Sequence, residues 1–375
     1  MKMNNLNAET EEKVEIKLGN IKAKAYKIPT DKPESDGTIK WDSTTMIVVE
    51  SEAAGYTGIG YTYTHSSAAE LINDRLSGII KNKNVMNIEA RWYDLLHAIR
   101  NIGRPGLVSE AISAIDISLY DLKARILGIP LVSLLGEYND GVEIYGSGGF
   151  TSYSISELQE QLSGWVDEGI PRVKMKIGRE PSNDVERVRA AREAIGNEAE
   201  LFVDANGAYT KKQALNKSIE FLKYGVSWYE EPVTSDDLEG LRLLRERVPP
   251  PIEVTAGEYG YDYFYFKRML DAGSVDVLQA DGTRCGGITG FLKAGVLCEA
   301  ANTPFSAHTA PAVHMHAGCC TKRLRHIEYF HDHVRIERMF FDGFPKPAGG
   351  RLVPDKSRPG LGFELKEKDI QKFEI

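Results

Sequence analysis

Residues 172–177, RVKMKI, decide the fold of this chain. In a β-strand successive side chains point to opposite faces, so Val173, Met175 and Ile177 would share one face. Lys174 and Lys176 would share the other. Because an unpaired buried ammonium group is costly, the lysine face needs anionic neighbours or a lowered pKa. The rest of the chain is therefore expected to bring carboxylates to this strand.

Seven further runs in residues 142–330 are strand-like, and helical patterns separate most of them. They are VEIYG (142–146), ELFVDA (200–205), VSWYEE (226–231), IEVTAGE (252–258), VDVLQAD (275–281), PFSAH (304–308) and HIEYF (326–330). Eight strands alternating with helices predict a parallel α/β sheet closed into a barrel, with a doubly wound open sheet as the alternative. No GxGxxG motif opens a helix after the first strand, which disfavours the dinucleotide-binding form of that alternative.

The first 140 residues are organised differently. The runs KAKAYKIP, TTMIVVE and GIGYTYTH are strand-like, and residues 107–128 predict a helix that ends at Gly128, shortly before Pro130. The polar segment 29–42, PTDKPESDGTIKWD, predicts a surface loop, with a mobile flap as the alternative. We therefore predict an α+β capping domain over residues 1–140, completed by residues 346–375, and a barrel over residues 141–345.

Ionisable side chains occur at or near the carboxyl ends of seven strands: Lys176, Asp204, Glu230, Glu258, Asp281, His308 and Glu328. They follow one another at intervals of 20 to 28 residues, about one strand–helix unit. Barrels of this kind build their active sites at the carboxyl ends of the strands. An acid after a strand often only caps the next helix, but capping does not explain lysines that face the lumen. We therefore predict that these groups converge on one rim.

Three carboxylates at consecutive strand ends, Asp204, Glu230 and Glu258, predict a magnesium site. Mg²⁺ prefers oxygen ligands and keeps coordination positions for substrate. Lys176, held near a second ammonium and the cation, would then have its pKa lowered enough to act as a base. Asp281 would orient His308 as a second acid/base group.

The ordered motifs resemble those of the enolase superfamily, specifically its mandelate racemase subgroup. They are ISAIDISLYDLKARILGIPLVSLLG, KMKIG, VDANGAY, WYEEPV, AGE, QADGTRCGGITG, SAHTAPA and HIEYF, in family order along nearly the whole chain. The resemblance implies a modified TIM barrel of the (β/α)7β type with an α+β capping domain. Muconate-lactonising and succinylbenzoate-synthase types carry a lysine where this chain has QADGTRC, which sets them apart.

The resemblance also implies roles for individual residues. Lys176 resembles the base that removes the proton α to a carboxylate, and Lys174 the group that binds that carboxylate. Asp281 and His308 resemble the dyad on the opposite face of the substrate. Glu328 resembles the acid that hydrogen-bonds the enolate oxygen.

Further implied contacts concern the metal and the substrate hydroxyls. The three metal ligands would be Asp204, Glu230 and Glu258, with Glu230 preferred to Glu231 because the family ligand is the first acid of Glu-Glu-Pro. One Mg²⁺ ion per subunit is implied. Asn206 resembles a residue that contacts a substrate hydroxyl. Trp41 or Lys40, in the segment that closes over the substrate in the family, would reach the distal hydroxyls.

The activity implied by this set is Mg²⁺-dependent proton abstraction through an enediolate intermediate. Dehydration of an acid sugar, an aldonate or aldarate, to a 2-keto-3-deoxy acid is the favoured reaction. Racemisation or epimerisation of a 2-hydroxy acid stays open, as does a catalytically silent sugar-acid-binding relative. The resemblance also implies a homo-oligomer, from dimer to octamer, and a small carboxylate substrate.

Composition narrows the partners. A net charge of -8 and a pI near 5.6, with basic and acidic residues interspersed, give no reason to expect nucleic acid. The first 13 residues, MKMNNLNAETEEK, lack the apolar core of a signal peptide, and no run of about 18 apolar residues occurs, so we expect a cytoplasmic protein without a membrane partner. Four cysteines without a CxxC pair predict buried, reduced thiols.

Two pairs of histidines lie outside this set. His314 and His316 form an HxH motif that binds zinc in some hydrolase barrels, but there it belongs to an early strand, so we expect a structural or rim position here. His331 and His333 follow the last strand in YFHDH and predict a surface or interface loop.

Overall fold

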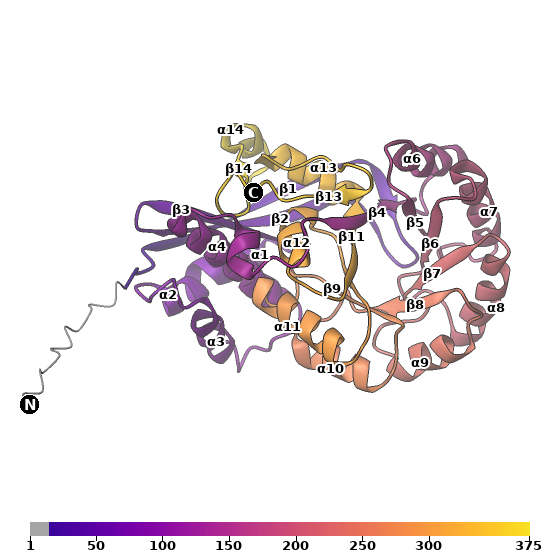
Figure 1. Ribbon diagram of the computed structural model, residues 1–375, viewed down its shortest axis with the longest axis horizontal. Helices are drawn as coiled ribbons and strands as arrows, with labels where there is room; N and C mark the ends of the chain where they lie inside the picture. The colour runs from indigo at the N-terminus through magenta and orange to yellow at the C-terminus, as the bar shows by residue number, and fades with distance from the viewer. Residues whose placement is uncertain (1–14) are drawn as a thin grey trace, which may run out of the picture.

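A closed barrel of eight parallel strands occupies the second half of the chain (Figure 1). The structure, a computed structural model, describes residues 15–375, so the polar stretch MKMNNLNAETEEK, on which the signal-peptide expectation rests, lies outside them. The strands are β4 (Val142–Gly148), β5 (Arg172–Lys176), β6 (Glu200–Asp204), β7 (Val226–Glu230), β8 (Glu253–Ala256), β9 (Val277–Ala280), β10 (Phe305–Ala307) and β11 (Leu324–Phe330). The last strand pairs with the first, Ile327 opposite Ile144, so the barrel prediction is confirmed and the open sheet is wrong.

Helices alternate with these strands around the outside of the barrel. They are α6 (Ile155–Asp167), α7 (Asp184–Ile195), α8 (Lys211–Leu222), α9 (Leu238–Arg247), α10 (Tyr263–Asp271), α11 (Gly287–Ala300), α12 (Pro311–Cys319) and α13 (His331–Phe340). Helix α6 begins at a capping box, in which the Ser154 side chain accepts from the Glu157 backbone and the Glu157 carboxylate accepts from the Ser154 backbone. A second capping box, between Thr210 and Gln213, starts α8.

The two faces of β5 separate as the strand periodicity predicts. Val173, Met175 and Ile177 are fully buried in the core between the strands and the outer helices. Lys174 and Lys176 point into the lumen, where carboxylates surround them. A cluster of Tyr145, Phe202, Trp228 and Val277 fills another level of the lumen, and the Phe202 and Trp228 rings stack at 5.1 Å.

The N-terminal part is an antiparallel sheet covered by helices, which confirms the α+β prediction. Its strands are β1 (Asn20–Ser35), β2 (Lys40–Ala53) and β3 (Tyr56–Tyr63). The helical elements are α1 (Ser67–Leu71), the π-helical η1 (Ile72–Leu76), α2 (Ser77–Ile80), α3 (Ile88–Ala98), α4 (Leu107–Leu127) and α5 (Leu131–Leu135). Helix α4 ends where expected, because Gly128 adopts φ 67°, a left-handed conformation that favours glycine.

The segment 29–42 is a β-hairpin rather than the predicted loop. The pairing register shifts between Pro29 and Glu34, after which Glu34 lies opposite Trp41 and the two strands continue. Asp36 stabilises the tip by accepting from the Ile39 amide at 2.8 Å. The tip rests against the barrel, since a Cβ atom on Gly37 would lie 2.4 Å from the Ala205 carbonyl oxygen. The bulge lets a proline-containing, polar sequence remain in a sheet.

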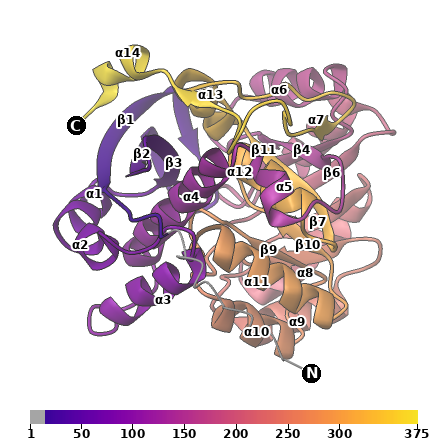
Figure 2. The ribbon, with the colours of Figure 1, turned by 60° about the vertical axis from the view of Figure 1, so that its left-hand side comes forward.

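The C-terminal segment touches both parts of the molecule. Strand β13 (Arg351–Leu352) pairs with β4, and β14 (Glu364–Leu365) pairs with β12 (Phe341–Asp342). Figure 2 shows α14 (Glu367–Ile370) near β1, and after the short 3-10 turn η2 (Gln371–Phe373) the Ile375 amide donates to the Ala25 carbonyl at 3.0 Å. The division at residue 140 and the assignment of 346–375 to the capping domain stay predictions.

Two smaller expectations concern cysteines and membranes. Cys285, Cys298 and Cys319 are buried, Cys320 is half-buried, and all four are free thiols, as predicted. Across residues 15–375, none of the helices combines the length and the apolar character that crossing a bilayer would require.

Candidate active site

Three carboxylates meet at the mouth of the barrel. Asp204 and Glu230 end β6 and β7, and Glu258 follows β8, so neighbouring strands carry all three. One oxygen from each lies within 4.8 Å of the others, and all three side chains are buried. The adjacent Glu231 is not a member of this triad. Glu231 adopts φ 37°, in the left-handed region, and lines a separate cavity beyond Tyr259.

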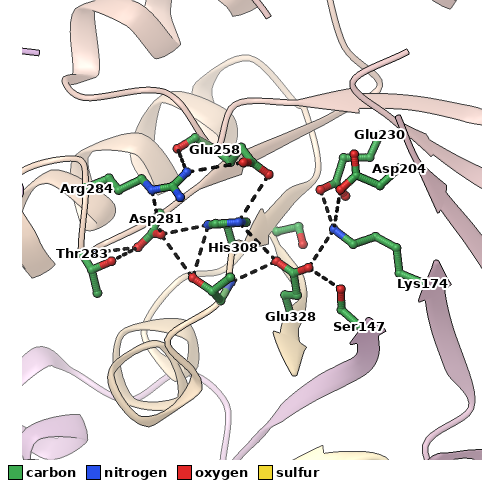
Figure 3. A network of polar contacts seen from close by, with 12 residues as sticks. Ser147, Lys174, Asp204, Glu230, Glu258, Asp281, Thr283, Arg284, His308 and Glu328 are labelled. Carbon is green, nitrogen blue, oxygen red and sulfur yellow. Dashed lines mark hydrogen bonds and ion pairs between the residues drawn. The ribbon is translucent and has the colours of Figure 1, made fainter. Parts of the chain in front are cut away.

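Lys174 lies at the centre of the acidic groups (Figure 3). Its Nζ is 2.5 Å from Glu230 Oε1, 2.8 Å from Glu328 Oε1 and 3.4 Å from Asp204 Oδ2, and the side chain is fully buried. Burial alone would lower the pKa of Lys174, but these carboxylates raise it well above its ordinary value. Lys174 does not line the cavity at the barrel mouth, so its contact with a substrate carboxylate stays a prediction.

Lys176 lines the cavity and pairs with one end of the triad. Its Nζ lies 2.5 Å from Asp204 Oδ2. Burial and the charge of Lys174 lower the pKa of Lys176, as the sequence predicts, but the Asp204 carboxylate outweighs both and raises it above the ordinary value. The expected lowered pKa is therefore not found. A cation ligated by Asp204 would counter this effect, because it would neutralise the carboxylate responsible.

His308 pairs with the other end of the triad. Its Nε2 lies 3.3 Å from Glu258 Oε2, and its Nδ1 hydrogen-bonds Asp281 Oδ2 at 2.9 Å. Burial alone would raise the pKa of Asp281, but the bond to His308 and the charge of Arg284 lower it below its usual range. An ionised Asp281 accepts a hydrogen bond from Nδ1–H and leaves Nε2 directed at the triad, the orientation predicted for an acid/base histidine.

Glu328 connects the histidine to Lys174 (Figure 3). Its Oε2 lies 3.6 Å from His308 Nε2, and its Oε1 accepts from Ser147 Oγ at 2.6 Å. Burial would raise the pKa of Glu328, yet Lys174 and His308 lower it below the ordinary value. The carboxylate is therefore ionised at the floor of the cavity.

A cavity of about 400 Å³ opens above these groups. Lys176, Asn206, Glu258, His308 and Glu328 line it from the barrel, and Trp41 lines it from the hairpin. Lys40, the alternative to Trp41, is exposed and does not line the cavity, because it lies on the opposite face of the strand. The structure thus brings together every predicted catalytic residue except Asp281, which reaches the cavity through His308.

Several lining residues were not predicted. Arg284 Nη1 lies 3.4 Å from Glu258 Oε1, and its guanidinium covers the Tyr259 ring at 5.2 Å. His333 stacks on Tyr63 at 3.6 Å between ring centroids and lines the cavity, so the loop expected after β11 is instead the start of helix α13. Arg284 stands inside the motif QADGTRC and could have been considered from its place three residues after Asp281. Nothing in the sequence signals the Tyr63–His333 stack.

The remaining histidines have structural partners. His314 is fully buried, accepts from the Gly282 amide at 2.8 Å and donates from Nδ1 to the Thr309 carbonyl at 2.7 Å. His316 is also buried and donates to the Leu361 carbonyl at 3.1 Å. Both histidines therefore hold backbone in place, as expected. His331 Nε2 hydrogen-bonds Asp31 Oδ2 at 2.9 Å, between α13 and β1.

The triad fits a hard divalent cation. All of its ligand atoms are carboxylate oxygens, the donors that Mg²⁺ prefers. Glu258 Oε2 is buried and has no hydrogen-bond partner among residues 15–375, which leaves an acceptor directed at the site. Burial and the neighbouring acids raise the pKa of Glu230 well above its usual value despite Lys174, so the site is short of positive charge. A bound cation would supply that charge.

Known proteins share both halves of this arrangement. A family model described as enolase C-terminal domain-like matches residues 157–369. A second, for the N-terminal domain of mandelate racemase / muconate lactonizing enzyme, matches residues 20–136. The chain therefore belongs to the enolase superfamily, and within it to the mandelate racemase subgroup.

Two curated relatives share about a third of their residues with this chain. A 3,6-anhydro-alpha-L-galactonate cycloisomerase from Streptomyces coelicolor is 32% identical over 92% of this chain and 96% of its own length. L-talarate/galactarate dehydratase from Salmonella typhimurium is 30% identical over 84% of this chain and 78% of its length.

Solved structures agree with these matches. A mandelate racemase/muconate lactonizing enzyme-like protein from Rubrobacter xylanophilus superposes with a TM-score of 0.94 and 53% identity, covering 96% of this chain and 100% of that one. L-talarate/galactarate dehydratase from Salmonella typhimurium LT2, liganded with Mg and L-lyxarohydroxamate, gives a TM-score of 0.88 and 26% identity, covering 100% of this chain and 96% of that one.

Proposed function

We propose that this chain dehydrates an acid sugar, an aldonate or aldarate, to a 2-keto-3-deoxy acid with Mg²⁺ as cofactor. One observation carries the proposal. Two basic side chains flank the acidic triad at its two ends, Lys176 beside Asp204 and His308 beside Glu258, and both line one cavity. A relative of 30% identity that is named a dehydratase supports the same reaction class.

Asp204, Glu230 and Glu258 would hold the cation. When bound, Mg²⁺ would supply positive charge where negative charge develops on the substrate carboxylate, which lowers the cost of removing the neighbouring proton. Lys174 would keep Glu230 and Glu328 in place through its two short contacts. Glu328 would hydrogen-bond the developing enolate oxygen only after taking up a proton, against the lowered pKa that Lys174 and His308 give it before substrate binds.

The proton transfers follow from the two flanking bases. Lys176 in its neutral form would take the proton from C2, and the C2–H electron pair would move into the carboxylate to give an enediolate. The electrons of the enediolate would then form the C2–C3 double bond as the C3–O bond breaks. His308, protonated on Nε2 and held by Asp281, would give its proton to the departing hydroxyl, which leaves as water. The enol product then becomes the 2-keto acid.

Epimerisation is the second candidate, because the same two bases would also serve it. If the substrate has no hydroxyl to lose at C3, His308 would instead return a proton to C2 from the face opposite Lys176. The cycloisomerase name of one relative shows that outcomes other than dehydration occur among similar chains. The product therefore distinguishes the candidates.

The test is an assay of the Mg²⁺-loaded protein on a stereochemically complete panel of aldonates and aldarates. Formation of a 2-keto acid, lost in Lys176→Ala, supports dehydration. Deuterium incorporation at C2 from D₂O without keto acid identifies an epimerase. No reaction of either kind on sugar acids and simple 2-hydroxy acids would contradict the proposal and favour the silent sugar-acid-binding relative. A cytoplasmic location and a homo-oligomeric state, from dimer to octamer, stay predictions.

A further inference from the structure

The part of the cavity wall built by the capping sheet carries hydroxyl groups. Ser43, Thr44 and Thr45 line the cavity from β2, and Thr64 lines it directly after β3. A hydroxyl can both donate and accept, so it matches the hydroxyls of a sugar chain. Because the acidic triad lies on the barrel side, this wall faces the end of the substrate that is distant from the reacting carbon.

Two acidic side chains, Asp332 and Glu34, lie behind this wall. Thr44 Oγ1 donates to the carboxylate of Asp332, which is fully buried at the start of α13. Trp41 Nε1 donates to Glu34 Oε2 at 2.7 Å, and Glu34 Oε1 is buried without a hydrogen-bond partner in the described part of the chain. Burial, and then the charge of Asp332, raise the pKa of Glu34 to about 9. A further anion would therefore be unfavourable here.

Arg335 is engaged by Asp332. Its guanidinium lies 2.5 Å from Asp332 Oδ1 and also donates to the Pro29 carbonyl. Arg335 does not line the cavity. It is therefore not free to pair with a carboxylate at the distal end of a substrate.

The other nearby guanidinium groups are also engaged. Arg284 lines the cavity, but it lies between Glu258 at 3.4 Å and Asp281 at 3.7 Å, at the metal end. Arg179 reaches the hairpin tip, yet it donates to the carbonyls of Asp36 and Ile39 and does not line the cavity. Among the described lining residues, the capping sheet contributes no lysine or arginine.

The two imidazoles of the wall do not replace a fixed cation. His333 is buried against Tyr63, and burial lowers its pKa to about 3, so the ring is neutral at physiological pH. His65 is exposed at the rim, where its Nδ1 hydrogen-bonds Ser67 Oγ at 2.8 Å. A buried second carboxylate would need a paired cation, which this wall does not present.

We propose that the cavity selects a monocarboxylic sugar acid, an aldonate with an uncharged hydroxymethyl end, over the dicarboxylic aldarate of the same configuration. The inference rests on the proposed function for the orientation of the substrate, with its reacting carboxylate at the triad. A hydroxymethyl end exchanges hydrogen bonds with the wall hydroxyls, whereas a carboxylate would lose its hydration beside buried acids.

Matched substrate pairs test the inference. Each aldonate is compared with the aldarate that has the same configuration at every stereocentre, such as galactonate with galactarate, at pH 8 with saturating Mg²⁺. We expect kcat/KM for the preferred aldonate to exceed that of its aldarate at least tenfold. An aldarate turned over as well as its aldonate partner, or better, overturns the inference.

A charge placed on the wall provides a second test. Ser43 shares a strand face with Trp41 and lines the cavity, so Ser43→Arg would present a guanidinium to the distal end. The aldarate-to-aldonate ratio of kcat/KM should rise about tenfold. Ser43→Gln, which extends the side chain without a charge, should leave the ratio unchanged. A ratio that does not respond to Ser43→Arg contradicts the placement of the distal end at this wall.

Binding separates this inference from the proposed function. If neither member of any pair is turned over, the proposed function fails, and titration calorimetry of the Mg²⁺-loaded protein with the same pairs decides the inference. Tighter binding of the aldonates supports the uncharged wall. Equal or tighter binding of the aldarates rejects it.

Discussion

At the level of single residues, the proposed mechanism assigns one proton transfer to Lys176 and the other to His308. Each touches a different end of the acidic triad, so each reaches a different face of a molecule bound there. General acid–base groups of this kind typically contribute about 10²- to 10⁴-fold in rate. Replacing either base should therefore affect the proton transfer on one face of the substrate only.

Lys176→Ala should slow C2 deuterium exchange of one epimer of the substrate by at least ~100-fold. His308→Asn should slow exchange of the other epimer by at least ~100-fold. Exchange is followed by NMR in D₂O with Mg²⁺ present. His314→Asn is a less suitable control, because His314 bridges two backbone segments. His97→Asn, at an exposed position of α3 that does not line the cavity, is matched to His308→Asn and should retain both exchanges. Small, equal losses for both epimers in Lys176→Ala and His308→Asn would contradict the assigned roles.

Glu230, the last residue of β7, and Glu231, directly after it, allow the effect of metal binding to be distinguished from the effect of burying a carboxyl group. Glu230 belongs to the triad and Glu231 does not, although both are buried. Mg²⁺ at 100 times its Kd should stabilise the native protein by about 2.7 kcal/mol and raise its Tm. EDTA should reverse the shift, Glu230→Gln should remove it, and Glu231→Gln should retain it. Loss of the shift in Glu231→Gln alone would place the ligand at the second acid.

The sequence predicts the site residues better than their electrostatics. Their order along the chain places Asp204, Glu230 and Glu258 on adjacent strand ends, which is enough to expect a triad. Burial lowers the pKa of Lys176, and the contact of 2.5 Å to Asp204 makes the largest contribution that raises it; no pattern encodes that distance. Arg284 and His333 reach the cavity only because a loop and a helix start take particular paths, which depend on tertiary packing.

At the level of elements, the hairpin formed by β1 and β2 connects the cap to the barrel mouth. Its tip contacts the barrel through Gly37, while Trp41 packs edge-on against Phe150 with ring centroids 5.6 Å apart. Arg179 holds the tip from the loop after β5. The closed position of the hairpin thus depends on a few contacts, of which Gly37 is the tightest.

Gly37→Ala should displace the tip, because the added Cβ would lie 2.4 Å from the Ala205 carbonyl and 2.7 Å from that of Ile177. Overpacking of this kind costs about 1–3 kcal/mol, which here would open the hairpin before it unfolds the protein. We expect kcat/KM to fall about tenfold and proteolysis near residues 36–39 to accelerate. Gly78→Ala, in a helix with open space around it, should change neither. Unchanged kinetics in Gly37→Ala would show that tip contact is unnecessary.

The strands of the barrel could be predicted from the sequence, but the hairpin of residues 29–42 could not. The barrel strands carry apolar residues on one face or both and end in turn signals, so periodicity identifies them. Residues 29–42 contain two prolines, a glycine and several charges, the composition of a loop. They form strands because the bulge after Pro29 restores the pairing and the tip packs on the barrel, and both causes lie outside the local sequence.

At the level of the whole molecule, Glu337 joins the cap to the barrel. Its Oε1 accepts from Tyr61 of β3 at 2.5 Å, and its Oε2 accepts from the Ala312 amide at the start of α12 at 3.0 Å. Burial raises the pKa of Glu337 from 4.5 to about 8, so the folded protein keeps this carboxyl protonated. Between pH 4.5 and 8 the folded chain therefore binds more protons here than the unfolded chain does.

The stability contributed by this group should fall as the pH rises from about 4.5 through 8, because the proton retained by the folded protein is progressively lost. Urea midpoints of the Mg²⁺-loaded protein at pH 6 and pH 9 measure the fall. Glu337→Gln, which cannot ionise, should show a smaller decrease in stability between the two pH values. An identical decrease in both proteins would assign the pH dependence to other groups.

The pairing of β11 with β4 has a consequence for synthesis on the ribosome. Ile144 emerges long before its partner Ile327, and Glu328 reaches Ser147 and Lys174 only across this same seam. Until the final strand is translated, the nascent barrel keeps an unpaired edge and an incompletely neutralised lysine in its lumen. Chaperone protection would matter most in that interval, and a premature stop before residue 324 would leave an open sheet that cannot become an enzyme.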